Sequence, residues 1–215
     1  MRRIKLTSIV LSFSILALTS CASSQQYAGS KKDGAFFTVP NGWNQISNSA
    51  LNKVEGATTD QAALDRLSLV SYQVGYTPTK NMTPKEVFAL APTDQPVIFA
   101  RFRDLFPEER NAISLNALRD IILPITGYQA GTQKNDRNFQ LSDDQEITEK
   151  GGKGVSLLYS FDYDGVNETI NQTALYSNDQ NKIYLFIVRC STKCYNKNID
   201  QIDKIVKSFT VRGTR

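Results

Sequence analysis

Two cysteines near the C-terminus, Cys190 and Cys194, are the residues whose type and spacing most directly suggest chemistry. Thiols at this separation can form a disulfide, stay reduced, exchange electrons or bind a metal. The spacing differs from the Cys-x-x-Cys of thioredoxin-like redox pairs, and no other nearby ligands suggest zinc. A structural disulfide and two free thiols therefore remain the main alternatives. Redox or metal chemistry is the least favoured interpretation.

The absence of histidine limits the catalytic chemistry that the chain can perform. Ser-His-Asp and Cys-His catalysis are excluded, and most transition-metal sites lose their preferred ligand. An enzyme would have to rely on carboxylates, lysine or tyrosine, and the acidic residues show no pairing typical of a hydrolase. We therefore predict a protein that is not an enzyme, with no catalytic residues, no metal site and no cofactor.

Two acidic segments are candidate cation sites with simpler explanations. Residues 162–168 (Asp-Tyr-Asp-Gly-Val-Asn-Glu) suggest a calcium loop, but their spacing is not that of an EF-hand, and a hairpin turn is favoured. Asp143, Asp144 and Glu146 form a small cluster that we expect to be solvated.

Basic and aromatic residues are interleaved in one mid-chain stretch, which contains Phe99, Arg101, Phe102, Arg103, Phe106 and Arg110. One interpretation is a partner-binding patch. The favoured interpretation is a strand whose alternate residues point to solvent.

Hydrophobic periodicity predicts strands and helices alternating through the first half of the chain. Strands 36–39 and 43–46 are expected to form a hairpin across Pro40-Asn41-Gly42, with Trp43 in the core. Residues 48–65 carry weak helical signals. The remaining predicted elements of this half are strand 67–76, helix 83–90, strand 97–102 and helix 107–123.

The second half is predicted to be mainly strands and turns. Strands 155–163 and 168–176 should pair across Asp164-Gly165, and the apolar strand 183–188 should be central in the sheet. The other predicted elements are strands 139–141 and 145–148, helix 198–206 and strand 209–211. The overall prediction is an α+β fold, with one antiparallel meander sheet flanked by helices.

The first 21 residues have the pattern of an export signal. Arg2, Arg3 and Lys5 precede an apolar run that is too short to span a bilayer, and the segment ends Leu18-Thr19-Ser20-Cys21. This resembles a bacterial lipoprotein signal. The resemblance implies a signal peptide over 1–20, cleavage between Ser20 and Cys21, and lipidation of Cys21 by diacylglycerol and an acyl chain such as palmitate.

Lipidation of Cys21 would place the protein on the extracytoplasmic face of a cell membrane, or in the periplasm or on the outer membrane of a two-membrane host. In that exported location a Cys190–Cys194 disulfide is favoured over free thiols. Residues 21–33 are small and polar, so we expect a flexible tether that reaches about 20 Å, followed by a single domain over 34–215.

The positive net charge of +4 is mostly a feature of the signal. Without Arg2, Arg3 and Lys5 there are 22 basic residues against 21 acidic ones, a net charge of +1. This gives no support for a nucleic-acid partner.

The domain resembles the PsbP-like family, which includes photosystem II extrinsic subunits, a Ran-binding protein and bacterial lipoproteins. The resemblance is carried by Phe37-Thr38-Val39-Pro40-Asn41-Gly42-Trp43 and by the closing segment Ile202-Asp203-Lys204-Ile205-Val206-Lys207-Ser208-Phe209. It implies an α/β/α sandwich and a function in protein binding or assembly. Residues 80–134 match least, and a specialised function would be sought there.

The leading hypothesis is a non-enzymatic, lipid-anchored binding or assembly module of the bacterial envelope, with an envelope protein as partner. The alternative is a small-ligand-binding lipoprotein with a pocket between sheet and helices.

Overall fold

The computed structural model describes residues 24–213, and within them the strands form two antiparallel sheets, one of seven strands and one of three. The predicted signal peptide, the cleavage site at Ser20 and the lipidation site at Cys21 lie outside the described residues.

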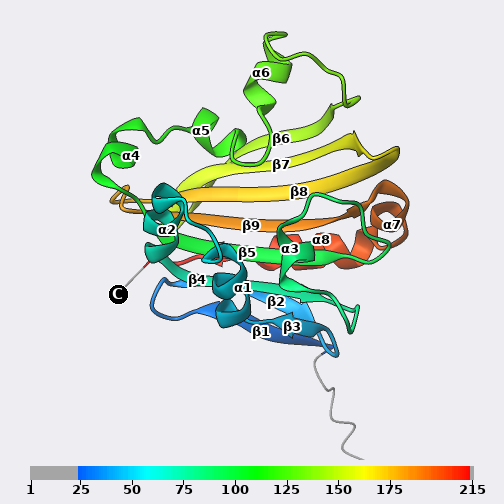
Figure 1. The fold of residues 1–215 in the computed structure, drawn as a ribbon, viewed down its shortest axis with the longest axis horizontal. Coiled ribbons are helices and arrows are strands. Elements are labelled where there is room, and N and C mark those ends of the chain that lie inside the picture. Colours follow the sequence, from blue (N-terminus) through cyan, green and yellow to red (C-terminus); the bar gives the residue numbers. More distant parts are fainter. Residues whose placement is uncertain (1–23, 214–215) are drawn as a thin grey trace, which may run out of the picture.

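The larger sheet joins two meanders, which meet where β5 pairs with β9 (Figure 1). The β7–β8 hairpin turns at Asp164 (φ 47°) and Gly165 (φ 77°), two positive φ values that a tight hairpin requires. In spatial order the strands are β3 (Asn44–Ile46), β4 (Val70–Thr77), β5 (Val97–Asp104), β9 (Lys182–Ser191), β8 (Val166–Ser177), β7 (Gly152–Tyr163) and β6 (Gln140–Glu149).

The smaller sheet and one long helix cover one face of the larger sheet, which we call the closed face. In this sheet β2 (Ala35–Pro40) pairs with β1 (Gln25–Ser30) and β10 (Thr210–Val211). Helix α8 (Ile199–Ser208) follows α7 (Thr192–Lys197) and buries Ile202 and Ile205. The apolar cluster beneath them includes Phe37, Phe102, Tyr184, Phe186 and Phe209.

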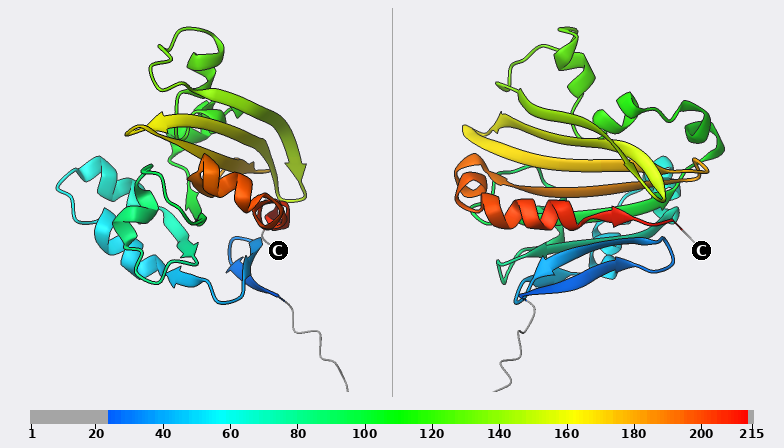
Figure 2. Two further views of the ribbon diagram at one scale, coloured as in Figure 1. Left: turned by 90° about the vertical axis from the view of Figure 1, so that its right-hand side faces the viewer. Right: turned by 180° about the vertical axis from the view of Figure 1, so that it is seen from behind.

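Short helices cover the opposite face, which we call the open face (Figure 2). A second apolar cluster lies beneath them and includes Leu51, Val87, Phe99, Leu118 and Ile187. The helices are α1 (Asn48–Glu55), α2 (Gln61–Ser68), α3 (Pro84–Phe88), α4 (Pro107–Ala112), α5 (Leu115–Arg119) and α6 (Ile125–Gln129).

The predicted α+β class is confirmed, because antiparallel sheet is flanked by helices on both faces. The hairpin across Asp164-Gly165 and the central position of β9 are also as predicted. Helix α3 begins at the expected capping box, where the Thr83 hydroxyl accepts from the Glu86 backbone N–H and the Glu86 carboxylate accepts from Thr83.

The predicted flexible tether is wrong for residues 25–33. Residues Gln25–Ser30 pair along the whole of β2, and Asp33 is buried in an ion pair with Lys182 at 2.8 Å. Backbone hydrogen bonds can hold a polar edge strand that buries little side-chain surface, and composition does not reveal this. The folded domain therefore begins near Gln25 instead of at residue 34.

The predicted N-terminal hairpin is also wrong, since β2 and β3 belong to different sheets. Both edges of β2 are occupied by β1 and β10, so β3 pairs with β4 instead. Trp43 lies in the segment that connects β2 to β3, and it is partly buried against the closed-face cluster.

The predicted helix over 107–123 is interrupted. Ile113 is extended (φ −63°, ψ 129°), and the Ser114 hydroxyl accepts from the Ala117 N–H to start α5. A serine that caps a new helix competes with continuation of the old one. The weak helical region 48–65 similarly forms two helices, and strands 139–141 and 145–148 are one bulged strand, β6.

Candidate functional site

The open face carries an apolar floor formed by strands β5, β8 and β9. Ile183, Leu185 and Ile187 alternate along β9, and the register places Phe99 of β5 opposite Ile187. Because side chains two residues apart share a face, these residues point the same way. Ile170 of β8 extends the floor.

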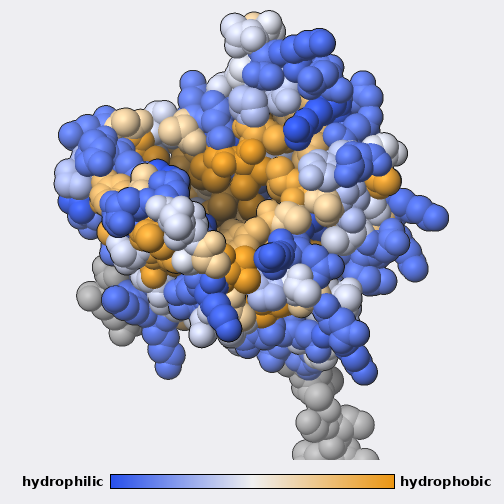
Figure 3. Space-filling model, in the orientation of Figure 1, coloured by the Kyte–Doolittle hydropathy of each residue, from blue (hydrophilic) through white to orange (hydrophobic). Residues whose placement is uncertain are grey.

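A cavity of about 450 Å³ lies between this floor and the short helices. Its walls are Ala63 of α2, Val87, Phe88 and Leu90 in and after α3, and Ile121 and Ile122 after α5. Figure 3 shows the cavity as an apolar hollow with hydrophilic side chains around its mouth. Half of the sixteen lining residues come from segment 80–134, the part of the sequence that matched its family resemblance least.

Charged side chains line the same cavity and are mostly arginines. Arg66, Arg101, Arg103 and Arg189 contribute to its walls, together with a single carboxylate, Glu55. We call this site the arginine-rimmed cavity.

Arg101 and Arg103 of β5 have different partners. The Arg103 guanidinium donates to both carboxylate oxygens of Glu109, at 2.7 and 2.8 Å. These hydrogen bonds are the largest cause of the lowered pKa of Glu109. Arg101 donates one terminal nitrogen to Glu55 at 2.5 Å, while its Nε is buried with no acceptor. Arg103 is thus bound bidentately, whereas Arg101 has one hydrogen bond to Glu55 and an unpaired Nε.

Arg189 lies at the end of the floor and forms a buried ion pair with Glu168. Its guanidinium donates to Glu168 at 3.0 Å and to the carbonyls of Ala91 and Glu86 at 2.9 and 2.7 Å. Glu168 is fully buried, and its second carboxylate oxygen has no hydrogen-bond donor. Burial raises the pKa of Glu168 to about 7, because it outweighs the opposing effect of Arg189.

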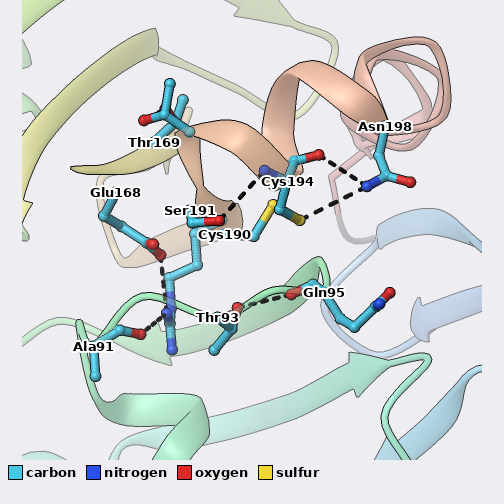
Figure 4. The surroundings of a disulfide bond; sticks show 11 residues. Ala91, Thr93, Gln95, Glu168, Thr169, Cys190, Ser191, Cys194 and Asn198 are labelled. Carbon is cyan, nitrogen blue, oxygen red and sulfur yellow. Dashed lines mark hydrogen bonds and ion pairs between the residues drawn. A yellow bond between two sulfur atoms is a disulfide. The ribbon is translucent and has the colours of Figure 1, made fainter. Parts of the chain in front are cut away.

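The predicted cysteine pair lies at the end of β9 and the start of α7, and the structure joins Cys190 to Cys194 in a disulfide with Cα atoms 5.8 Å apart (Figure 4). Both cysteines belong to the closed-face cluster. The Ser191 hydroxyl between them accepts from the Cys194 N–H and caps α7. The bond therefore links a strand to a helix on the face opposite the arginine-rimmed cavity.

The acidic segments serve structural roles. Asp162 accepts from Asn167 and Asn138 beside the β7–β8 turn, and these hydrogen bonds lower its pKa. In the second segment, Asp144 and Glu146 pair with Arg119 at 2.9 and 3.5 Å. Within residues 24–213, no three His, Cys, Asp or Glu side chains gather as metal ligands would.

The interpretation of the mid-chain arginines as solvent-facing is wrong for Arg101 and Arg103 of β5, whereas Arg110 of α4 is exposed. Phe99, Arg101 and Arg103 point into the arginine-rimmed cavity, while Phe102 is fully buried on the closed face. Sequence reasoning missed Arg66 and Arg189 entirely. An arginine directly after the apolar run 183–188 was the available signal, because a charge that continues a buried strand needs partners.

Helices of the described chain, residues 24–213, are too short or too polar for any of them to cross a bilayer.

No family model matches the chain, and no curated protein matches it in sequence. Among solved structures it is similar to the cyanobacterial PsbP of Synechocystis sp. PCC 6803, with 16% identity, a TM-score of 0.49, and coverage of 90% of this chain and 98% of that one. It is also similar to LpqN of Mycobacterium tuberculosis, described as involved in cell envelope biogenesis (16% identity, TM-score 0.45, 82% of each chain).

A third similar structure is the Ran-binding protein Mog1p of Saccharomyces cerevisiae, with 10% identity and a TM-score of 0.45 over 88% of this chain and 96% of that one. These are distant likenesses in the arrangement of strands and helices. They assign no activity and no residue role to this chain.

Proposed function

We propose that this chain is a lipid-anchored, non-enzymatic binding protein of the bacterial cell envelope, and that its arginine-rimmed cavity holds the apolar part of a small ligand. The single observation that carries the proposal is the apolar cavity of about 450 Å³ between the sheet and the short helices.

The size and lining of the cavity support a small-molecule ligand. Pockets for such ligands have volumes of about 300–1,000 Å³ and combine an apolar lining with a few polar groups. Here the floor is made of side chains on paired strands, so its shape is set before any ligand arrives. Covering apolar surface contributes about 25 cal/mol per Å² toward binding.

The start of β1 brings the expected lipid anchor close to the domain. Gln25 follows Cys21 by four residues, a distance of at most ~14 Å along an extended chain. An anchor at Cys21 would therefore hold the domain against the membrane surface on the extracytoplasmic side. Amphipathic molecules are concentrated at such a surface. The envelope protein partner expected from the sequence stays a prediction.

The test fills the cavity by substitution at Ala63, which lines it on α2. Both apolar clusters are built from residues between Ala35 and Val211, so a soluble chain over 22–215 carries both cores. We expect this chain to bind an uncharged naphthylamine fluorophore and Ala63→Trp to reduce the affinity at least about tenfold, because the indole occupies ligand space.

The matched control is Ala62→Trp, one residue earlier on α2 and exposed to solvent. It adds the same side chain outside the cavity and should leave fluorophore binding unchanged. Melting curves of both variants establish that they are folded. Equal fluorophore affinity in the two folded variants, or no binding to the wild-type chain, would contradict the proposed function.

A further inference from the structure

We infer that the occupant of the arginine-rimmed cavity is a long-chain fatty acid, whose carboxylate binds Arg101 while its chain lies on the apolar floor. This inference rests on the proposed function and names the class of its ligand.

Arg101 lines the cavity, and its hydrogen bonding is incomplete. Its Nε is buried without an acceptor, although Glu55 accepts from a terminal nitrogen of the same guanidinium. A buried donor left unpaired is costly, and most such groups in folded proteins find a partner. The Arg101 side chain also keeps about 20% of its surface exposed, so a ligand carboxylate in the cavity would reach the guanidinium beside Glu55.

The other cavity arginines differ in what they can offer a ligand. Arg103 is held by a bidentate ion pair with Glu109, and Arg189 donates to Glu168 and two backbone carbonyls. Arg66 makes no ion pair within residues 24–213 and is exposed at the cavity. Arg101 is therefore the expected contact for an anion, and Arg66 is expected to add a weaker, solvent-screened attraction.

The charges around the cavity also favour an anion. Its four arginines face three carboxylates, which are Glu55 in the wall and the bonded partners Glu109 and Glu168. With all three ionised, one positive charge is left over, and protonation of Glu168 would add to this excess, so an anion is favoured. A planar guanidinium fork also matches the geometry of a carboxylate, which can accept two parallel hydrogen bonds.

The shape of the floor favours a single extended chain. Ile183, Leu185 and Ile187 follow one strand, and the four steps from Ile183 to Ile187 cover about 14 Å. Arg101 is paired directly with Leu185 in the middle of this stretch. An apolar chain along β9 would thus lie beside the guanidinium that receives its acidic head.

The experiment compares three single-chain amphiphiles with the same acyl group, each used below its critical micelle concentration. Palmitate is the proposed ligand class, monopalmitoylglycerol is its uncharged counterpart, and palmitoyl-lysophosphatidylglycerol carries a phosphate. Binding to the 22–215 chain is measured by calorimetry and by displacement of the naphthylamine fluorophore. We expect palmitate to bind most tightly.

The arginine variants then locate the head group. We expect Arg101→Gln to weaken palmitate about 10- to 100-fold and to leave monopalmitoylglycerol unchanged, because a charge-assisted hydrogen bond is lost. Arg101→Lys should restore part of the affinity, and Arg66→Gln should cost about two- to fivefold. Lys207→Gln removes an equal charge from an exposed site on α8 and should have no effect.

The outcomes separate the two proposals. Equal affinity for palmitate and monopalmitoylglycerol, or tighter binding of the lysophospholipid, would overturn the fatty-acid assignment. The proposed function would still stand if Ala63→Trp blocked the fluorophore. An unchanged palmitate affinity in folded Arg101→Gln and Arg66→Gln would likewise overturn the inference. Failure of both fluorophore and palmitate to bind would reject the cavity as a binding site and the inference with it.

Discussion

The two faces of the seven-stranded sheet are made by the same strands and differ in how tightly they are packed. On the closed face, Phe186 packs between Phe37 and Phe209, with ring centroids 4.9 and 4.7 Å away. On the open face, the neighbouring Leu185 and Ile187 line a cavity of about 450 Å³. Alternation along one strand thus assigns stability to one set of residues and leaves the other set available for binding.

The sharpest test of this comparison substitutes two adjacent residues of β9. Phe186→Ala should lower the free energy of unfolding by about 3–5 kcal/mol, because it leaves a void in a filled core. Leu185→Ala should cost about 2 kcal/mol, since its side chain already borders open space. Urea unfolding of the two variants measures both losses.

Ligand binding provides the opposite readout for the same pair. Leu185→Ala should weaken binding of the naphthylamine fluorophore, whereas Phe186→Ala should leave it near the wild-type value under conditions where the variant is folded. Equal destabilisation by the two variants, together with equal fluorophore binding, would contradict the proposal that the closed face provides stability and the open face provides binding.

Each face also contains a buried carboxylate, and the pKa values of the two are shifted in opposite directions. Asp33, on the side of the small sheet, accepts hydrogen bonds from Lys182, Ser30 and Ser71. Burial alone would raise the pKa of Asp33, but these donors outweigh it and the pKa is lowered. Glu168 on the open face has Arg189 as its donor, and there burial wins and raises the pKa to about 7. Asp33 has more donors than Glu168 and is less strongly desolvated, and both differences favour its lowered pKa.

The two carboxylates should therefore give stability opposite dependences on pH. The contribution of Asp33 is present above its unfolded pKa of 3.8 and is lost as the pH falls below that value. Glu168 binds its proton more tightly in the folded state, so its contribution is present below pH 4.5 and is lost as the pH rises toward 7. Asp33→Asn should cost about 2–3 kcal/mol at neutral pH.

Urea unfolding at a series of pH values measures how the stability contributed by each carboxylate changes with pH. Relative to wild type, Asp33→Asn should become less costly as the pH falls below about 4. Glu168→Gln should become less costly as the pH rises from 4.5 to 7. Asp94→Asn, at an exposed position, controls for the loss of one carboxylate. Slopes of the same sign for the two buried sites would contradict the comparison.

Features that arise from neighbouring residues were predicted correctly from the sequence. The Asp164-Gly165 turn, the apolar run of β9 and the periodicity of α8 each arise from neighbouring residues, so they identified hairpin, central strand and helix correctly. The disulfide partners were likewise near one another in sequence. These features need no knowledge of distant parts of the chain.

The features that the sequence did not predict depend on distant pairings. Strand β1 forms because it can pair with an edge of β2. Strand β3 does not pair with β2, because the C-terminal strand β10 occupies the other edge. The arginine-rimmed cavity needs β5, β9 and helices from separate segments. Arg101 looked like a solvent-facing strand residue because period-two alternation cannot distinguish a solvated face from a partly covered one.

The smallest expected effect comes from the disulfide on the closed face. Replacing both cysteines, Cys190→Ala with Cys194→Ala, should lower the free energy of unfolding by less than about 2 kcal/mol, because a bond that closes so short a loop removes little chain entropy. Palmitate binding should be unchanged, since the bond lies on the face opposite the cavity. Reduction of the wild-type chain should reproduce both results. A larger loss of stability, or a loss of binding, would show that the two faces are coupled through the end of β9.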